Sequence, residues 1–313
     1  MRIIYYNTAD PGGAGIAAFQ QRLPEAQIRL WHPGDESPAD YALVWKPPLA
    51  MLAGRPELKA ICNLGAGVDA ILPLLAQLPA HVPVYRLEDA GMGEQMADYV
   101  SLAVLGYFRR MDEYRQLATQ ACWQPKPARN KSAFPVTILG LGVLGQAIAQ
   151  RLLLLGFPVS GWSRSAKQFS EQIRGVNCYH GQDQLSAALA EAKVLVSILP
   201  LTEQTRAIIN RQTLMHMPAG GYLINVGRGA HVVEADLLQL LANGHLAGAT
   251  LDVVQTEPLP PSHALWQNNK ITITPHISAL TLAQESEIQF AEKIRRLEQG
   301  LPVTGMIDRS RGY

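Results

Sequence analysis

The chain has 313 residues, enough for two domains of ordinary size, each with its own apolar core. Hydrophobic residues make up 48% of the sequence and the formal net charge is +1, so composition gives no sign of nucleic acid or an anionic membrane as a partner. The apolar runs are much shorter than the ~20 residues that cross a bilayer. Nor does the N-terminus have the sustained apolar stretch of a secretory signal.

The three cysteines, Cys62, Cys122 and Cys178, lie far apart with no CxxC pair. This spacing argues against a disulfide framework or a thiolate zinc site, and is typical of a reducing compartment. The HExxH pattern of zinc enzymes and the GxxxxGK pattern of nucleotide hydrolases are also absent from the sequence. We therefore expect a cytoplasmic protein without a metal site.

In the first hundred residues, short strand-like runs alternate with helical stretches, as in a parallel α/β sheet. A helix is expected near Ala14–Leu23, and a long one leaves this region between Ala90 and Leu117, before the breakers at Trp123–Pro127. The expected strands are Arg2–Tyr6, Tyr41–Trp45, Lys59–Asn63 and Val82–Arg86.

A second series of six strand-like runs with helices between them predicts a doubly wound nucleotide-binding domain in the middle of the chain. A final helix is expected from Leu282 to Gly300. The six expected strands are Phe134–Leu139, Val159–Trp162, Val194–Leu199, Tyr222–Val226, Ala249–Val253 and Ile271–Thr274.

A glycine-rich turn follows the first strand of this series. Residues 140–145 form a complete GxGxxG, with a strand-like run before it and a helical one after it. In this context Gly140 permits a tight turn, Gly142 lets a pyrophosphate approach the backbone, and Gly145 lets helix and strand pack closely. Together with Val143 and Leu144, these residues are predicted to bind the pyrophosphate of a dinucleotide at a helix N-terminus.

The end of the next strand favours one cofactor over another. NAD-selective sites usually carry an acidic residue ~20 positions after the first glycine, where it binds the ribose hydroxyls. Here Ser163, Arg164 and Ser165 follow the strand, with no carboxylate among them. Arginine can hold a 2′-phosphate through two parallel hydrogen bonds, and serine hydroxyls add neutral donors. We predict NADP(H); the alternative is that Arg164 is only a solvated surface charge.

Three segments after predicted strands offer the groups that reduction of a 2-keto acid requires, namely a cation for the carboxylate and an acid for the developing alkoxide. Arg228, between two glycines, can bind carboxylate and carbonyl oxygens together. His276 follows the last strand, and Glu257 lies in the segment after the preceding one. A carboxylate paired with the imidazole would favour its protonated form. We predict that these three residues are the catalytic set.

The first domain offers two candidate substrate-binding features. The glycines of Asn63–Asp69 could present backbone N–H groups to an anion, so that Ala66 and Gly67 hold the substrate carboxylate on the side opposite Arg228. An ordinary left-handed turn is an equal alternative for these glycines. Trp45 could close off the pocket for the substrate side chain and favour small acids.

Together these segments resemble the D-isomer-specific 2-hydroxyacid dehydrogenase family. The resemblance implies an α/β fold of two Rossmann-like or flavodoxin-like doubly wound parallel-sheet domains, with a catalytic cleft between them. It implies that residues 1–100 and 284–313 form the substrate domain and residues 101–283 the NADP-binding domain. It extends over essentially the whole chain, through Tyr41–Trp45, Leu64–Asp69, Arg86–Asp89, Gly91–Met96, Ile273–His276 and Arg311–Tyr313.

The same resemblance implies roles for individual residues. It makes Arg228 the group that orients the substrate, His276 the proton donor and Glu257 the residue that tunes it. Met96 and Asp252 would lie near the nicotinamide, and homodimers built on the cofactor domain are usual in the family. The expected lining of the cofactor cleft is Leu199, Pro200 and Val226.

The leading hypothesis is thus an NADPH-dependent reductase of glyoxylate and hydroxypyruvate, acting on a small 2-keto acid. Another or broader D-2-hydroxyacid dehydrogenase activity, such as one on lactate, is an alternative, because the catalytic set handles only the shared carboxylate–carbonyl unit. A dinucleotide-sensing binding protein without catalysis is the alternative from a different class. A short-chain dehydrogenase is disfavoured, because the sequence contains no Tyr-x-x-x-Lys.

Overall fold

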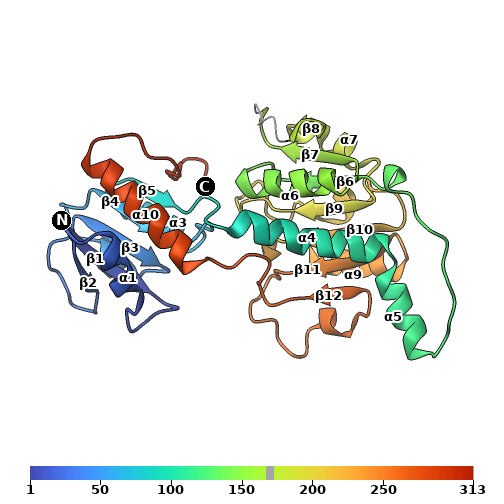
Figure 1. Cartoon of the computed structure of the whole chain (residues 1–313). Helices are drawn as coiled ribbons and strands as arrows, with labels where there is room; N and C mark the ends of the chain where they lie inside the picture. Colours follow the sequence, from blue (N-terminus) through green and yellow to red (C-terminus); the bar gives the residue numbers. More distant parts are fainter. Residues whose placement is uncertain (167–172, 313) are drawn as a thin grey trace. The chain divides into compact units, whose positions relative to one another are not determined.

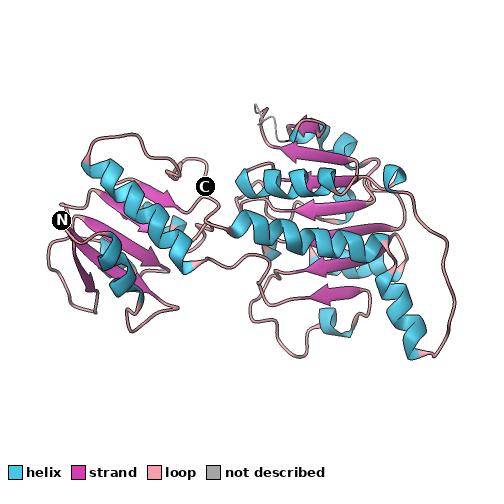
Figure 2. Ribbon diagram, in the orientation of Figure 1, coloured by secondary structure: helices cyan, strands magenta, loops and turns pink. Residues whose placement is uncertain are grey.

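The structure is a computed structural model that describes residues 1–166 and 173–312, so Tyr313 of the terminal Arg311–Tyr313 motif lies outside the described residues. The chain forms two compact units, one of residues 1–91 with 281–313 and one of residues 92–280. Each unit is built on one parallel β-sheet with helices against it (Figure 2). The predicted α/β class with two parallel-sheet domains is confirmed.

The units change over at the ends of helices. The sequence pattern predicts the changes near residues 100 and 283, and in the structure they fall between residues 91 and 92 and between residues 280 and 281, so that α4 (Met92–Phe108) lies whole in the second unit and α10 (Ala283–Glu298) whole in the first. Because a helix is held together by its own hydrogen bonds, two units separate more readily at the end of a helix than inside it.

In the described residues, no helix is both long and apolar enough to cross a membrane.

The first unit has a five-stranded sheet in the order β2-β1-β3-β4-β5. The sequence pattern did not predict β2, an edge strand whose four residues carry no buried side chain and so give no apolar signal. The strands are β1 (Arg2–Asn7), β2 (Gln27–Leu30), β3 (Tyr41–Trp45), β4 (Ala60–Asn63) and β5 (Val84–Arg86). The helices are α1 (Gly15–Arg22), α2 (Leu49–Leu52) and α3 (Leu72–Leu75), completed by α10.

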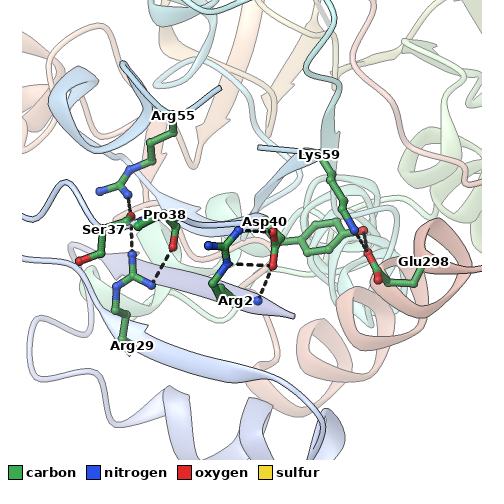
Figure 3. Close-up of polar contacts among 9 residues, drawn as sticks. Arg2, Arg29, Ser37, Pro38, Asp40, Arg55, Lys59 and Glu298 are labelled. Atoms are coloured by element: carbon green, nitrogen blue, oxygen red, sulfur yellow. Dashed lines mark hydrogen bonds and ion pairs between the residues drawn. The ribbon is translucent and has the colours of Figure 1, made fainter. Parts of the chain in front are cut away.

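Polar contacts join α10, from the far end of the chain, to the N-terminal sheet (Figure 3). The buried Tyr41 hydroxyl donates a hydrogen bond to Glu298 Oε1 at 2.6 Å, and Lys59 Nζ lies 2.7 Å from the same oxygen. Burial and the neighbouring carboxylate raise the pKa of Tyr41, so its hydroxyl stays a donor. The C-terminal helix is therefore bound to β3, the strand that ends at Trp45.

A second group of contacts, drawn in part in Figure 3, fixes the start of β3. Arg2 donates to Asp40 through its backbone N–H at 2.7 Å and through Nη2 at 2.8 Å. These bonds to Arg2 lower the pKa of Asp40 to about 2. The buried Arg55 guanidinium donates to the carbonyl oxygens of Ser37 and Asp35, and loss of solvent lowers its pKa. Together they hold the chain that enters β3.

The second unit has a seven-stranded sheet in the order β12-β11-β10-β9-β6-β7-β8. All six predicted strands are present within a few residues of their expected ends. The sequence pattern did not predict β8, an edge strand of largely exposed residues. The strands are β6 (Val136–Leu139), β7 (Val159–Ser163), β8 (Asn177–His180), β9 (Val194–Ser197), β10 (Gly221–Asn225), β11 (Leu246–Leu251) and β12 (Ile271–Ile273).

Helices cover both faces of this sheet, as alternating strand residues show. Ile138 and Ile224 pack with α4 and α6 on one face, while Leu139 and Leu223 pack with α7 and α9 on the other. The described helices of this unit are α4, α5 (Met111–Thr119), α6 (Val143–Leu154), α7 (Leu185–Leu189), α8 (Arg211–Leu214) and α9 (Glu234–Ala242), with short 3₁₀ turns η1 (Lys131–Ala133), η3 (Gln182–Gln184), η4 (Gly229–His231) and η5 (Ala264–Gln267).

The long helix predicted between Ala90 and Leu117 is divided in two. Arg110 adopts a left-handed backbone with φ +59°, which ends α4 and lets α5 leave in a new direction (Figure 1). In α5 no residue is buried, and Trp123 in the following segment is 99% exposed. The long run with few helix breakers predicted the helical segment but could not reveal the change of direction at one residue.

The strand order reverses between β6 and β9. From β6 the chain builds outward to β7 and β8, then returns to β9 and builds the other way to β12. Segments that follow β6 and β9 therefore diverge at the carboxyl edge of the sheet. Such a switch point is where doubly wound sheets bind their ligands.

Candidate active site

The glycine turn after β6 has the shape that a pyrophosphate site requires. Gly140 has φ +110°, and a Cβ atom there would lie 2.8 Å from Ile198 O. A Cβ atom on Gly145 would lie 1.9 Å from Gly140 O, so neither position can carry a side chain. Gly142 is the N-cap of α6, and a Cβ atom there would meet no heavy atom within 4 Å. The helix N-terminus is thus open to a phosphate, and the residues present fit a dinucleotide.

The end of β7 presents an exposed cation. Ser163 is buried, and its hydroxyl donates to Ser165 O at 2.9 Å, while Arg164 and Ser165 are exposed. Arg164 Nη1 donates to Gln204 Oε1 at 3.2 Å, a contact that sequence analysis did not anticipate. A guanidinium and two hydroxyl groups therefore stand where an NAD-selective site would place a carboxylate.

The segment after β9 lies against two loops at once. A Cβ atom on Gly140 would be 3.3 Å from Leu199 N, and one on Gly227 would be 3.2 Å from the same atom. The side chain of Leu199 is buried in the core that covers one face of the sheet. The glycine turn after β6 and the loop that carries Arg228 therefore both pack against the backbone of Leu199.

The Arg228 loop has its shape fixed by backbone contacts. At the end of β10, the buried Asn225 donates from Nδ2 to Arg228 O at 2.9 Å and accepts from Gly227 N at 3.2 Å. A Cβ atom on Gly229 would lie 1.9 Å from the carbonyl carbon of Val254, so this position admits glycine alone. Half-buried Arg228 donates from Nη1 to Gly227 O at 2.7 Å.

His231 is a site residue that sequence analysis did not single out. It is 0% exposed, and its Nδ1 accepts the backbone N–H of Arg228 at 3.2 Å. A ring nitrogen that accepts carries no proton, so the ring is neutral with its proton on Nε2, which donates to Pro200 O at 3.3 Å. The imidazole therefore joins the Arg228 loop to the segment after β9. The available signal was a polar residue in the otherwise apolar run Ala230–Val233.

His276 and Glu257 are in direct contact. His276 Nδ1 lies 2.9 Å from Glu257 Oε2, and the two side chains are 46% and 40% exposed. Glu257 Oε1 also accepts the backbone N–H of Val254 at 3.2 Å. Because a carboxylate accepts, Nδ1 is the donor, and Nε2 is the ring nitrogen at which a proton can be exchanged with another molecule. His276 has a left-handed backbone with φ +56°.

The buried Asp252 organises the loop that carries His276. Its Oδ1 accepts from Thr274 Oγ1 at 2.6 Å and from Ile277 N at 2.8 Å, and its Oδ2 accepts from Ser278 N at 2.8 Å. Thr274 has one hydroxyl proton and gives it to the carboxylate, so Tyr99 of α4 donates to Thr274 at 2.5 Å. Burial raises the pKa of Tyr99 to about 12, which keeps this donor protonated. The contacts explain how the loop is held in place.

Two residues expected beside the cofactor lie in an apolar core. Met96 of α4 and Val226 after β10 are both buried in the cluster that α4 and α6 form against the sheet. The sequence pattern identifies them as apolar, and the structure places them where apolar side chains pack.

The substrate-binding candidates of the first unit are brought together. The ring of Trp45 lies on Gly65, where a Cβ atom would be 2.2 Å from the indole, and Lys46 Nζ is 5.9 Å from the ring centroid. Ala66 and Gly67, next along the loop, are partly exposed. The loop is therefore bounded by an aromatic wall and retains accessible backbone.

Comparison with known proteins matches residues 101–278 to the D-isomer specific 2-hydroxyacid dehydrogenase, NAD binding domain. Over 317 aligned residues, covering all of both chains, the sequence is 49% identical to glyoxylate/hydroxypyruvate reductase A of Serratia proteamaculans and 47% identical to that of Salmonella typhi. The predicted nicotinamide-cofactor domain is thus confirmed.

Solved structures agree over the full length. A D-isomer specific 2-hydroxyacid dehydrogenase from Xanthobacter autotrophicus Py2, in complex with NADPH and MES, is 39% identical with a TM-score of 0.93 and covers 100% of this chain and 99% of its own. An NADPH-dependent glyoxylate/hydroxypyruvate reductase from Sinorhizobium meliloti, in complex with NADP and sulfate, is 33% identical with a TM-score of 0.90 and the same coverage. The chain therefore belongs to the D-isomer specific 2-hydroxyacid dehydrogenase family.

Proposed function

We propose that this protein is an NADPH-dependent reductase that converts glyoxylate to glycolate and hydroxypyruvate to D-glycerate. The observation that carries the proposal is the contact between His276 and Glu257 at the same sheet edge as Arg228. The three segments follow β12, β11 and β10, which are neighbours in one parallel sheet, so all leave it at the carboxyl edge. The names of the relatives above support the choice of substrates.

In this proposal each residue has one task. NADPH, when bound, supplies the hydride that reduces the keto carbon. Arg228 holds the carboxylate and carbonyl oxygens through its planar guanidinium. His276 donates a proton from Nε2 to the developing alkoxide, and Glu257 orients the ring by accepting the hydrogen bond from Nδ1. Ala66 and Gly67 of the first domain bind the substrate carboxylate.

The first test is turnover. NADPH oxidation is followed with glyoxylate, hydroxypyruvate, pyruvate and a bulky aromatic 2-keto acid. We expect glyoxylate and hydroxypyruvate to react best, with Trp45 limiting the substrate side chain. Arg228→Ala should abolish turnover while NADPH still binds. Equal rates with the aromatic acid would contradict the substrate assignment, and a wild-type protein that binds NADPH but reduces none of these acids would indicate a sensor.

The cofactor preference is assigned to Arg164, flanked by Ser163 and Ser165. Arg164→Ala should raise the KM for NADPH much more than the KM for NADH, because only NADPH carries the 2′-phosphate. Arg211→Ala is a matched control, since Arg211 is exposed and makes the same type of contact, from Nη1 to Gln239 Oε1 at 3.1 Å. Equal effects of Arg164→Ala on both cofactors would contradict the assignment.

We also propose a homodimer built on the cofactor domain and a cytoplasmic location. Large apolar side chains that are exposed on the second unit support the dimer. Leu102 of α4 is 72% exposed, Leu154 of α6 is 78% exposed, and Trp123 in the segment after α5 is 99% exposed. The three free thiols support a reducing compartment. Leu102→Asp combined with Trp123→Ser should yield a monomer in analytical ultracentrifugation, whereas Leu301→Asp in the first unit should not. A dimer in both variants would refute this interface.

A further inference from the structure

The side-chain amide of Asn63 donates its hydrogen bonds to the glycine loop that follows it. Asn63 ends β4, is 1% exposed, and donates from Nδ2 to Gly65 O and to Gly67 O, each at 2.9 Å. Its Oδ1 accepts no hydrogen bond from the described residues. An amide nitrogen has two protons, so both donors are used within one loop.

These two bonds determine which way the loop turns its N–H groups. A peptide unit is planar and trans, so the N–H of each residue points opposite to the carbonyl that precedes it. With Gly65 O directed at the Asn63 amide, the N–H of Ala66 is directed away from it. The same relation turns the N–H of Val68 away, because Gly67 O is directed inward. Two donors of one loop are thus oriented away from the buried amide.

The loop has little freedom to leave this arrangement. Gly65 O also accepts the backbone N–H of Leu87 at 3.2 Å, and the Trp45 ring occupies the side on which Gly65 would carry a Cβ atom. A tryptophan wall and a buried amide therefore hold Gly65 from two directions. A rigid donor that needs no rearrangement on binding increases affinity for an anion.

We propose that Asn63 is a positioning residue, which sets the Ala66 N–H for the carboxylate of the 2-keto acid. This inference rests on the proposed function and deepens it. Asn63 lies in the first unit and the glycine turn for the dinucleotide in the second, so the binding of the acid and the binding of NADPH are measured separately.

The test compares Asn63→Asp, Asn63→Ala and Asn63→Ser with the wild-type enzyme. A carboxylate has nearly the same shape as the amide but cannot donate, and it would face two carbonyl oxygens. We expect Asn63→Asp and Asn63→Ala to raise the KM for glyoxylate about tenfold, in line with the loss of one to two hydrogen bonds. The dissociation constant of NADPH, measured by fluorescence, should stay within a factor of two. Asn63→Ser keeps one O–H donor and should recover part of the loss.

Cys62→Ala is the matched control, because Cys62 is buried on the same strand and its side chain points to the opposite face. It should leave the KM for glyoxylate unchanged. A wild-type KM in a folded Asn63→Ala variant would overturn the inference, as would an equal loss of affinity for NADPH. Absence of turnover in the wild-type enzyme would instead refute the proposed function, so the two failures are distinguishable.

Discussion

Two histidines lie in loops at the same edge of the second sheet, in opposite environments. His231 follows β10, is 0% exposed, and uses both ring nitrogens on backbone groups. His276 follows β12, has a 46% exposed side chain, and bonds a carboxylate through Nδ1. The first ring can hold the loops it joins but has no proton to exchange with another molecule. The second can exchange a proton at Nε2.

The comparison predicts opposite effects on stability and turnover. An exposed ion pair contributes about 0–1 kcal/mol to the free energy of unfolding. Each buried group that loses its partner costs about 1–3 kcal/mol. Substitutions in the His276–Glu257 pair should therefore reduce turnover and spare the fold, whereas substitutions of His231 should do more to the fold than to the chemistry.

The largest effect is expected for His276→Asn. Asparagine tolerates the left-handed backbone at this position better than most residues, so the loop should keep its shape. Loss of the proton donor should lower kcat by about 10²- to 10⁴-fold. Steady-state kinetics and thermal unfolding test this together. A variant with a tenth or more of the wild-type kcat would rule out His276 as the donor.

Glu257→Gln should lower kcat about tenfold, because a charge-assisted hydrogen bond contributes about 1.5–3 kcal/mol where it is sheltered and less where it is exposed. The melting temperature should stay within a degree or two, since both side chains are partly exposed and an exposed ion pair adds little to stability. A large drop in melting temperature without loss of kcat would show that Glu257 stabilises the fold and does not assist turnover.

His231→Phe tests the buried ring. Phenylalanine keeps an aromatic ring of similar size but leaves Arg228 N–H without its acceptor and removes one of the two donors to Pro200 O, which keeps the Thr205 hydroxyl, so the free energy of unfolding should fall by about 1–3 kcal/mol. We expect only a several-fold loss of kcat/KM, through looser positioning of Arg228. His231→Gln keeps a donor and an acceptor and should recover part of both losses. Wild-type stability in His231→Phe would show that the two bonds contribute nothing.

The smallest effect is expected for Tyr99→Phe, which removes the outermost hydrogen bond of the His276 loop. We expect kcat to fall about twofold and stability by about 1 kcal/mol. Tyr222→Phe is the matched control, since Tyr222 shares a hydrogen bond of 2.9 Å with Thr250 inside the sheet. It should lower stability by a similar amount and leave kcat unchanged. Equal kinetics in the two variants would exclude a catalytic effect of the Tyr99–Thr274 contact.

The sequence by itself determined the features that depend on neighbours along the chain. The glycine turn was predictable, because Gly140, Gly142 and Gly145 lie within one six-residue segment between a strand and a helix. Arg228 and His276 were found because each directly follows an apolar strand, and parallel strands end at a common edge. The edge strands β2 and β8 were missed because short exposed strands carry no apolar pattern.

Only the tertiary structure decided the contacts between residues distant in sequence. His231 and Pro200 are 31 positions apart, Asp252 and Ser278 are 26 apart, and Tyr99 and Thr274 are 175 apart. A buried histidine, tyrosine or asparagine looks the same in the sequence as one in solvent. The physical reason is that a hydrogen bond depends on distance and direction, which packing sets once the sheet order is formed. The sequence supplied the groups for the chemistry, and packing selected which of them hold the others in place.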